Sequence, residues 1–251
     1  MTNKCFITEF NVSVNNDNLK KFGVMTLGCS NNNNGKSFNI ESSEPITLKA
    51  QGGGFTDSSY QNPSPTIDIP ANRNISVYLE KNKGITIEVP SKYGLTVLML
   101  SIGVYVKDNK DIDYCTSLKK LTLGSALPGT IIFEYLTSLE IFRATYKATE
   151  FRGNIEELAN AANLKELDIN HSSGLSGNIS ALSGLTNLKT IDLEGTYING
   201  DANIFADNTK FAGLSLSGAI LKLHNAYGIS NKTEEVKTAI EAAHPGITVT
   251  I

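Results

Sequence analysis

An apolar triplet with the spacing L-x-x-L-x-L recurs along the second half of the chain. Residues 164–169 show this spacing, and residues 188–193 repeat it 24 positions later. The first residues of six copies stand at positions 95, 118, 139, 164, 188 and 211, so the steps are 23, 21, 25, 24 and 23 residues. Alternating apolar residues are typical of a strand, and a repeat of about 20–29 residues predicts stacked strands.

A second phrase, L-x-G-x-I, recurs in register with the triplets. Its glycines Gly129, Gly153 and Gly177 stand 24 residues apart, and Gly200 belongs to a looser fourth copy. One such repeat cannot bury its apolar face alone, so neighbouring repeats share one core and one parallel sheet. A Leu-rich α/β domain in which both phrases coincide by chance is the weaker interpretation.

These phrases resemble the leucine-rich repeat superfamily, and L-x-G-x-I is similar to the 24-residue variant of plant receptor ectodomains. The resemblance covers about residues 85–251 and implies a β-rich solenoid with a parallel sheet. The family carries an Asn just past the third apolar position, whose side chain caps backbone groups between repeats. Ser172 and Thr196 lie there in this chain, so that ladder is either absent or made by hydroxyl groups.

The first 72 residues have a different texture. Short alternating segments occur at residues 5–14, 22–27, 37–40, 46–48 and 66–69, separated by turn-forming Asn, Gly and Pro. Such spacing predicts a small antiparallel β-sandwich. The strands 75–79 and 85–89 are expected to form a hairpin over residues 74–89 that covers one end of the repeats.

The remaining chain, residues 73–251, is expected to be the repeat domain, with six repeats from about 93 to 230 and a cap over residues 231–251. The cap begins with an amphipathic helix over residues 233–243, for which Asn231 is the predicted N-cap. The predicted apolar face of the helix consists of Val236, Ala239, Ile240 and Ala243. A last strand over residues 247–251 follows, with polar residues at alternate positions. We therefore expect an α+β, β-rich fold.

Composition excludes several functional classes. A net charge of −3 and a pI near 5.7 provide no electrostatic footprint for nucleic acid. The apolar run over residues 94–106 is shorter than the roughly 20 residues that span a bilayer, so no membrane insertion is expected. The polar opening residues do not read as a Sec signal peptide, which favours a virion or cytoplasmic location. The three cysteines are expected to be reduced thiols.

No motif for catalysis, a cofactor or a metal is visible. The three histidines, at positions 171, 224 and 244, never lie at i, i+4, and no G-x-S-x-G elbow occurs. Asp168 and Asp192 occupy the same repeat position, which places them about 5 Å apart on adjacent strands. One interpretation is a carboxylate pair or cation site. The other, which we prefer, is a solvated acidic patch.

A binding surface is expected on the outward face of the sheet. The residue between the last two apolar positions of each triplet points outward, and this row consists of Met99, Thr122, Arg143, Asp168, Asp192 and Ser215. Asn170 and Glu194 lie just past their triplets. The row lacks aromatic anchors, so Tyr105, Tyr146 and Tyr197 near the strand ends are further candidates.

The predicted function is non-catalytic binding of a protein partner. A short β domain ahead of such repeats is similar to leucine-rich repeat proteins of tailed phages of gut anaerobes. That resemblance implies a fibre, decoration or adaptor protein of the virion, with a virion protein or host-surface component as partner. The alternatives are a bacterial repeat protein for adhesion or intracellular interaction and, less favoured, an enzyme or cation-binding protein. The N-terminal domain could also mediate homo-oligomerisation.

Overall fold

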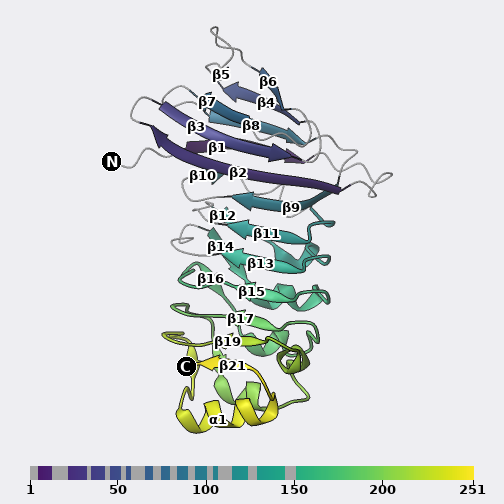
Figure 1. Ribbon diagram of the computed structural model, residues 1–251, viewed down its shortest axis with the longest axis vertical. Helices are drawn as coiled ribbons and strands as arrows, with labels where there is room; N and C mark the ends of the chain where they lie inside the picture. Colours follow the sequence, from purple (N-terminus) through teal and green to yellow (C-terminus); the bar gives the residue numbers. More distant parts are fainter. Residues whose placement is uncertain are drawn as a thin grey trace. The chain divides into compact units, whose positions relative to one another are not determined.

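The computed structural model describes residues 115–123, 129–144 and 151–251 continuously (Figure 1). Upstream of residue 115 it describes strands, with side chains only for Thr47, Thr66, Asp68 and residues 96–99. The chain forms two compact units, Met1–Ile131 (unit 1) and Ile132–Ile251 (unit 2). The predicted domain boundary after residue 72 falls inside unit 1 and stays a prediction. Turn-forming residues between the predicted strands, residues 52–54 among them, lie outside the described residues.

Unit 1 consists of strands at most of the segments whose alternation predicted them. The strands are β1 (Cys5–Val12), β2 (Phe22–Asn32), β3 (Gly35–Ser42), β4 (Ile46–Gln51), β5 (Phe55–Asp57), β6 (Thr66–Ile69), β7 (Ile75–Leu79), β8 (Gly84–Val89), β9 (Gly94–Leu100), β10 (Val104–Val106), β11 (Lys120–Leu123) and β12 (Gly129–Thr130). One sheet has the order β10-β1-β8-β4-β6, and β11-β9-β2-β3-β7-β5 are neighbours in another. Face-to-face packing of the two as a sandwich stays a prediction, since most side chains there lie outside the described residues.

The predicted hairpin over residues 74–89 is wrong. Both of its strands form, but β7 pairs with β3 and β5, whereas β8 pairs with β1 and β4. Alternation of apolar and polar residues defines a strand and its buried face, but it does not specify the strand's partner. Among the described strands, β2 and β3 form a hairpin instead, with Asn32 opposite Gly35.

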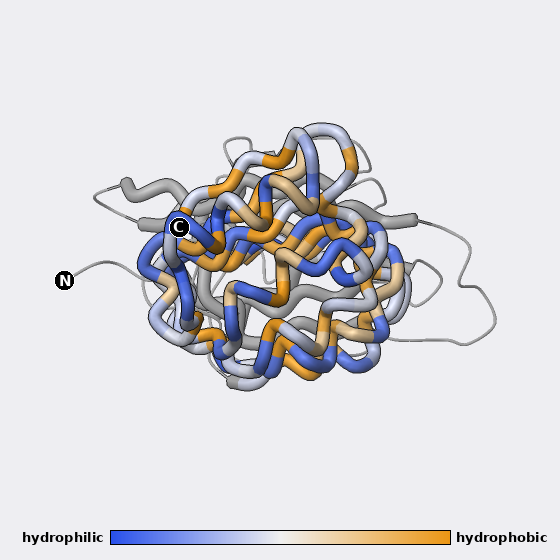
Figure 2. The backbone as a smooth tube through the Cα atoms, turned by 90° about the horizontal axis from the view of Figure 1, so that it is seen from below, coloured by the Kyte–Doolittle hydropathy of each residue, from blue (hydrophilic) through white to orange (hydrophobic). Residues whose placement is uncertain are grey.

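Unit 2 contains a sheet of short parallel strands (Figure 1). In order they are β13 (Ile141–Ala144), β15 (Glu166–Asp168), β17 (Thr190–Asp192), β19 (Ile220–Lys222) and β21 (Thr248–Thr250). Their register places one buried residue of each strand beside the next: Phe142, Leu167, Ile191, Leu221 and Val249. Figure 2 looks along this stack, and hydrophobic and hydrophilic residues alternate along each coil. The predicted repeat stack is thereby confirmed from β13 to β17.

Between strands, the chain returns through short 3₁₀ helices. These are η1 (Phe133–Tyr135), η2 (Ile155–Asn160), η3 (Ile179–Leu182), η4 (Ala202–Ala206) and η5 (Ala212–Ser215). Two small parallel pairs accompany them, β14 (Phe151–Asn154) with β16 (Leu175–Ser176) and β18 (Gly200–Asp201) with β20 (Ile229–Ser230). At three of the repeated glycines the following residue caps the next helix: Asn154, Asn178 and Asp201 accept hydrogen bonds from N–H groups at 3.0, 2.9 and 2.9 Å. The glycine phrase therefore combines a cap with a buried apolar residue.

The sixth predicted triplet is wrong. Leu214 lies in η5, and Leu221 on β19 takes the place beside Ile191. A 3₁₀ helix has about three residues per turn, so the spacing from Phe211 to Leu214 fits a helical turn as well as a strand entry. The actual strand follows Gly218, which stands where the triplet requires its first apolar residue.

The extra turn before β19 packs into the body of unit 2. The rings of Phe205 and Phe211 lie 4.8 Å apart between centroids, and both are fully buried. Gly213 approaches the backbone of the preceding repeat so closely that an added Cβ would lie 2.4 Å from the Leu188 carbonyl oxygen. The lengthened repeat is thus an integral part of the core.

Hydroxyl groups occupy the position three residues past the third apolar residue of two triplets. Ser172 is fully buried and donates a hydrogen bond to the Ala144 carbonyl of the preceding repeat. Thr196 is also fully buried, but it donates at 2.7 Å to Leu193 of its own repeat. One of these two side chains therefore links neighbouring repeats, and the other closes a local turn.

The last helix, α1 (Glu234–Ala243), begins later than predicted. Thr233 is its N-cap and accepts a hydrogen bond from the Val236 N–H at 3.3 Å. The predicted cap, Asn231, has a left-handed φ of 56° and stands outside the helix. Ile240 is fully buried as predicted, whereas Ala239 is exposed. Both polar residues of β21 are exposed, as their alternation predicts.

His244 joins α1 to the lengthened repeat. Its ring is fully buried, with Nε2 lying 2.9 Å from the Phe205 carbonyl oxygen and Nδ1 2.7 Å from the Ser215 hydroxyl. A carbonyl only accepts, so Nε2 donates to it, and Nδ1 is hydrogen-bonded to the Ser215 hydroxyl. Both ring nitrogens are therefore used in holding three segments together.

Replacing Gly213 with Ala tests the packing of the extra turn. We expect Gly213→Ala to lower the free energy of unfolding by about 2 kcal/mol or more, because the new methyl group meets rigid backbone. Gly184→Ala is the matched control, since a Cβ there meets nothing within 4 Å. Urea unfolding of both variants measures the difference. Equal stability of the two would contradict the close approach.

Candidate binding surface

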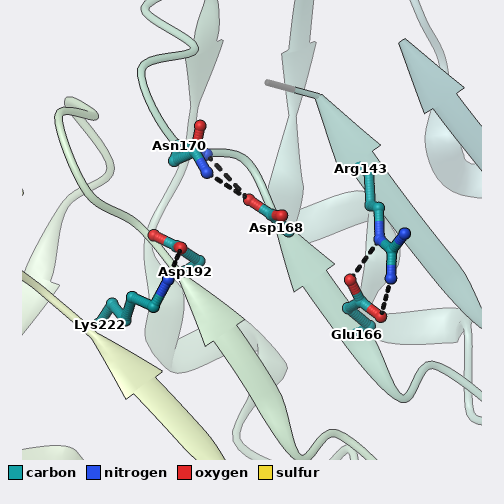
Figure 3. Close-up of polar contacts among 6 residues, drawn as sticks. All are labelled: Arg143, Glu166, Asp168, Asn170, Asp192 and Lys222. Atoms are coloured by element: carbon teal, nitrogen blue, oxygen red, sulfur yellow. Dashed lines mark hydrogen bonds and ion pairs between the residues drawn. The ribbon is translucent and has the colours of Figure 1, made fainter. Parts of the chain in front are cut away.

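Four charged residues lie in register on the outward side of the parallel strands (Figure 3). Arg143 stands opposite Asp168, Asp168 opposite Asp192, and Asp192 opposite Lys222. On each of these strands the central residue is buried, so its neighbours are directed away from the core. These four residues together with Glu166 are called the charged face.

The other predicted surface residues divide between the two units. Met99 on β9 and Thr122 on β11 stand opposite each other in unit 1, and both are half-buried. Ser215 does not belong to the row, because η5 carries it and its hydroxyl is bonded to His244. The row continues instead with Lys222, which the predicted triplets do not include. Residues 220–223 alternate between apolar and polar types as residues 190–193 do, and this similarity could have predicted the position of Lys222.

Two ion pairs organise the charged face. The Arg143 guanidinium donates from Nε and Nη2 to the two carboxylate oxygens of Glu166, the second at 2.9 Å. Lys222 Nζ lies 2.9 Å from Asp192 Oδ2. These hydrogen bonds to carboxylates raise the pKa of Arg143 and of Lys222 above their ordinary values. The long side chains of Arg143 and Lys222 are therefore held in place on the sheet.

Asp192 is a buried carboxylate. It is only 4% exposed, and the Glu194 N–H donates to its Oδ1 at 3.1 Å while Lys222 occupies Oδ2. The interpretation of a solvated acidic patch is therefore wrong for this residue. Its charge is tolerated because both oxygens receive a donor as the strand register brings Lys222 alongside.

Asp168 is hydrogen-bonded to an amide rather than, among the described residues, to a cation. Its Oδ1 accepts hydrogen bonds from the Asn170 amide Nδ2 at 2.9 Å and, more weakly, from the Asn170 N–H at 3.5 Å. Desolvation by burial, followed by repulsion from Asp192, raises the pKa of Asp168 above its ordinary value. Arg143, although directly opposite, is bonded to Glu166 instead. Among the described residues Asp168 therefore has no hydrogen-bonded cation, and the repulsion from Asp192 exceeds the attraction of Lys222.

An exposed aromatic pair lies beyond the ends of β17 and β19. Tyr197 is 58% exposed and Tyr227 is 63% exposed, and their rings stack at 5.2 Å between centroids. The sequence suggested Tyr197 but not its partner. The side chain of Tyr105 and all of Tyr146 lie outside the described residues.

The described residues provide neither a cluster of metal ligands nor a membrane-spanning helix. Within the part of the chain that the structure describes, no group of three His, Cys, Asp or Glu side chains could hold a metal ion. His171 and His224 are exposed on different turns, and His244 is buried elsewhere. No helix among the described residues combines the length and apolar character needed to cross a bilayer.

Comparison with known proteins gives a partial structural similarity only. No protein-family model matches the chain, and no curated protein matches it. Among solved structures, the leucine-rich repeat ectodomain of the receptor kinase SOBIR1 from Arabidopsis thaliana is similar, with a TM-score of 0.33 and 19% identity. The match covers 48% of this chain and 64% of that one, which is less than two thirds of the ectodomain.

The mostly parallel sheet with few helices is that of a repeat solenoid, in which the strand register from β13 to β21 aligns one buried residue of each strand.

The two aspartates are predicted to respond oppositely to neutralisation. Because the folded-state pKa of Asp168 is raised, its ionised form costs stability at neutral pH, and the cost disappears as pH falls through that pKa. Asp168→Asn should therefore raise the free energy of unfolding at pH 7 by about 0.2–1 kcal/mol, as expected for removing a like-charge cross-strand pair. The gain should vanish toward pH 3.

Asp192→Asn is the comparison variant. It removes the acceptor of Lys222 and should lower the free energy of unfolding by about 1–2 kcal/mol at pH 7. Urea unfolding of both variants across pH 3–7 tests the contrast. Destabilisation by both substitutions at pH 7 would show that Asp168 is compensated after all.

Proposed function

We propose that this chain is a non-catalytic binding protein that presents the charged face of its parallel sheet to an extended protein partner. The observation that carries the proposal is the register of Arg143, Asp168, Asp192 and Lys222 on four adjacent strands. A solenoid offers such a row as a continuous surface, and a partner crossing the strands meets one residue about every 4.8 Å.

The charges on this surface are pre-positioned, which supports a recognition role. Arg143 is held by Glu166 and Lys222 by Asp192, so a partner need not order these side chains when it binds. Reduced ordering on binding favours affinity, and a fixed pattern of charge favours specificity. The exposed pair of Tyr197 and Tyr227 adds apolar area at the same strand ends.

The absence of catalysis is part of the proposal. The Ser215–His244 contact is the arrangement of described residues closest to a nucleophile with a base. His244 is fully buried and its other nitrogen is bonded to the Phe205 carbonyl, which supports a role in packing. The pair of Asp168 and Asp192 supports no cation site either, since both oxygens of Asp192 are already engaged.

The more specific form of the proposal is a virion-associated fibre, decoration or adaptor protein. It is supported only by the sequence resemblance to repeat proteins of tailed phages. Mass spectrometry of purified particles from the source should detect the chain. Its absence from the particles would favour the alternative of a bacterial repeat protein for adhesion or intracellular interaction.

Selection from a display library of random short peptides tests the proposed surface. Peptides that bind the full chain should bind Thr190→Arg at least about 10-fold more weakly, because Thr190 lies between Glu166 and Ile220 on the outward side of the sheet. The control is Thr186→Arg, a substitution of equal size and charge in the turn before β17. Equal binding by both variants would show that the charged face is not the binding surface.

A further inference from the structure

We propose that the charged face recognises a basic side chain, Lys or Arg, of an extended peptide, and that Asp168 is the residue that pairs with it. The inference rests on the proposed function and adds the chemistry of the partner. It follows from the way in which the charges of the face are already matched among themselves.

Each carboxylate of the face except Asp168 has an intramolecular cation. Glu166 is bonded to both donating nitrogens of Arg143, and Asp192 to Lys222 (Figure 3). The two cations stand at the ends of the row and the two aspartates in its middle. Because Arg143 is bonded to Glu166, the repulsion that Asp168 experiences from Asp192 is offset only in part by the attraction of Lys222. The middle of the row therefore attracts a positive group from outside.

The acceptor on Asp168 suits one ammonium or guanidinium group. Its Oδ1 accepts both hydrogen bonds from Asn170, and Oδ2 accepts none from the described residues. A divalent cation would need several oxygens, but the two oxygens of neighbouring Asp192 are occupied by Glu194 N–H and Lys222. A single charge-assisted hydrogen bond from Lys or Arg needs only the unoccupied oxygen.

The exposed tyrosines are an independent indication of the same partner chemistry. Tyr197 and Tyr227 each stand five positions after a residue of the charged face, Asp192 and Lys222. They stack on each other, so each ring leaves one face outside the pair. Aromatic faces attract guanidinium and ammonium groups. The outer face of either ring can therefore accept a basic side chain.

The test selects random short peptides displayed on phage against the full chain. Peptides selected by the wild-type chain should be enriched in Lys and Arg, and their affinity should fall at least about 10-fold for Asp168→Asn. Asp207→Asn is the control, since it removes the same charge from a turn outside the face and should bind as the wild type does. Tyr227→Ala should weaken peptides that contain Arg.

Asp168→Asn is predicted to be at least as stable as the wild-type chain, so lost binding cannot be ascribed to unfolding. Thermal unfolding of the same samples verifies this. Failure to select peptides, absence of Lys and Arg enrichment, or equal binding by Asp168→Asn and Asp207→Asn would overturn the inference. If Thr190→Arg abolishes binding while Asp168→Asn does not, the proposed surface stands and its basic partner is wrong. If neither variant affects binding, the proposed surface falls as well.

Discussion

The side-by-side packing of Phe142, Leu167 and Ile191 is the contact on which the rest of unit 2 depends. Each is fully buried, and burial of one such side chain contributes about 1.5–3 kcal/mol. No strand of three or four residues could shield its own apolar residue, so each repeat is completed by its neighbours. The register between adjacent strands is therefore fixed, because a shift of one residue would turn the buried side chain outward.

The charged face is a consequence of that register. Residues flanking a buried position must project outward, and equivalent residues of adjacent repeats must become neighbours. Two repeats that share an Asp at the same position therefore bring two carboxylates together. Lys222 pairs with the carboxylate of Asp192. Arg143 is bonded to Glu166 instead of Asp168, so Asp168 is repelled by Asp192. An uncompensated charge held on a rigid sheet is tolerable where an external partner can neutralise it.

The lengthened repeat shows how the stack accommodates irregularity. Lys222 stands 30 positions after Asp192, yet its strand keeps the register of the sheet. The additional residues form η5 and bury Phe211 against Phe205, while His244 binds the segment to the last helix. Local insertion is possible because the hydrogen bonds of the sheet constrain only the short strands, and the return segments can lengthen outside it.

The spacing of apolar residues was sufficient to predict parallel strands at β13, β15 and β17, the burial of their central residues and the outward direction of Arg143, Asp168 and Asp192. These follow from one repeat unit and its period. The partner of β7, the strand at Leu221 and the ion pairs of the face were not predictable in that way. Strand pairing across long sequence separations depends on the assembled sheet, and an i, i+3 spacing is shared by a 3₁₀ turn and a strand entry.

The amino-acid sequence by itself thus determined the repeating unit and the side of the sheet on which each residue of a repeat lies. Three features depend on the packing of the repeats against one another. Arg143 bonds to Glu166 and not to Asp168, Asp192 becomes buried, and Tyr197 stacks on Tyr227. Such contacts depend on distances between side chains of different repeats, which local periodicity does not predict.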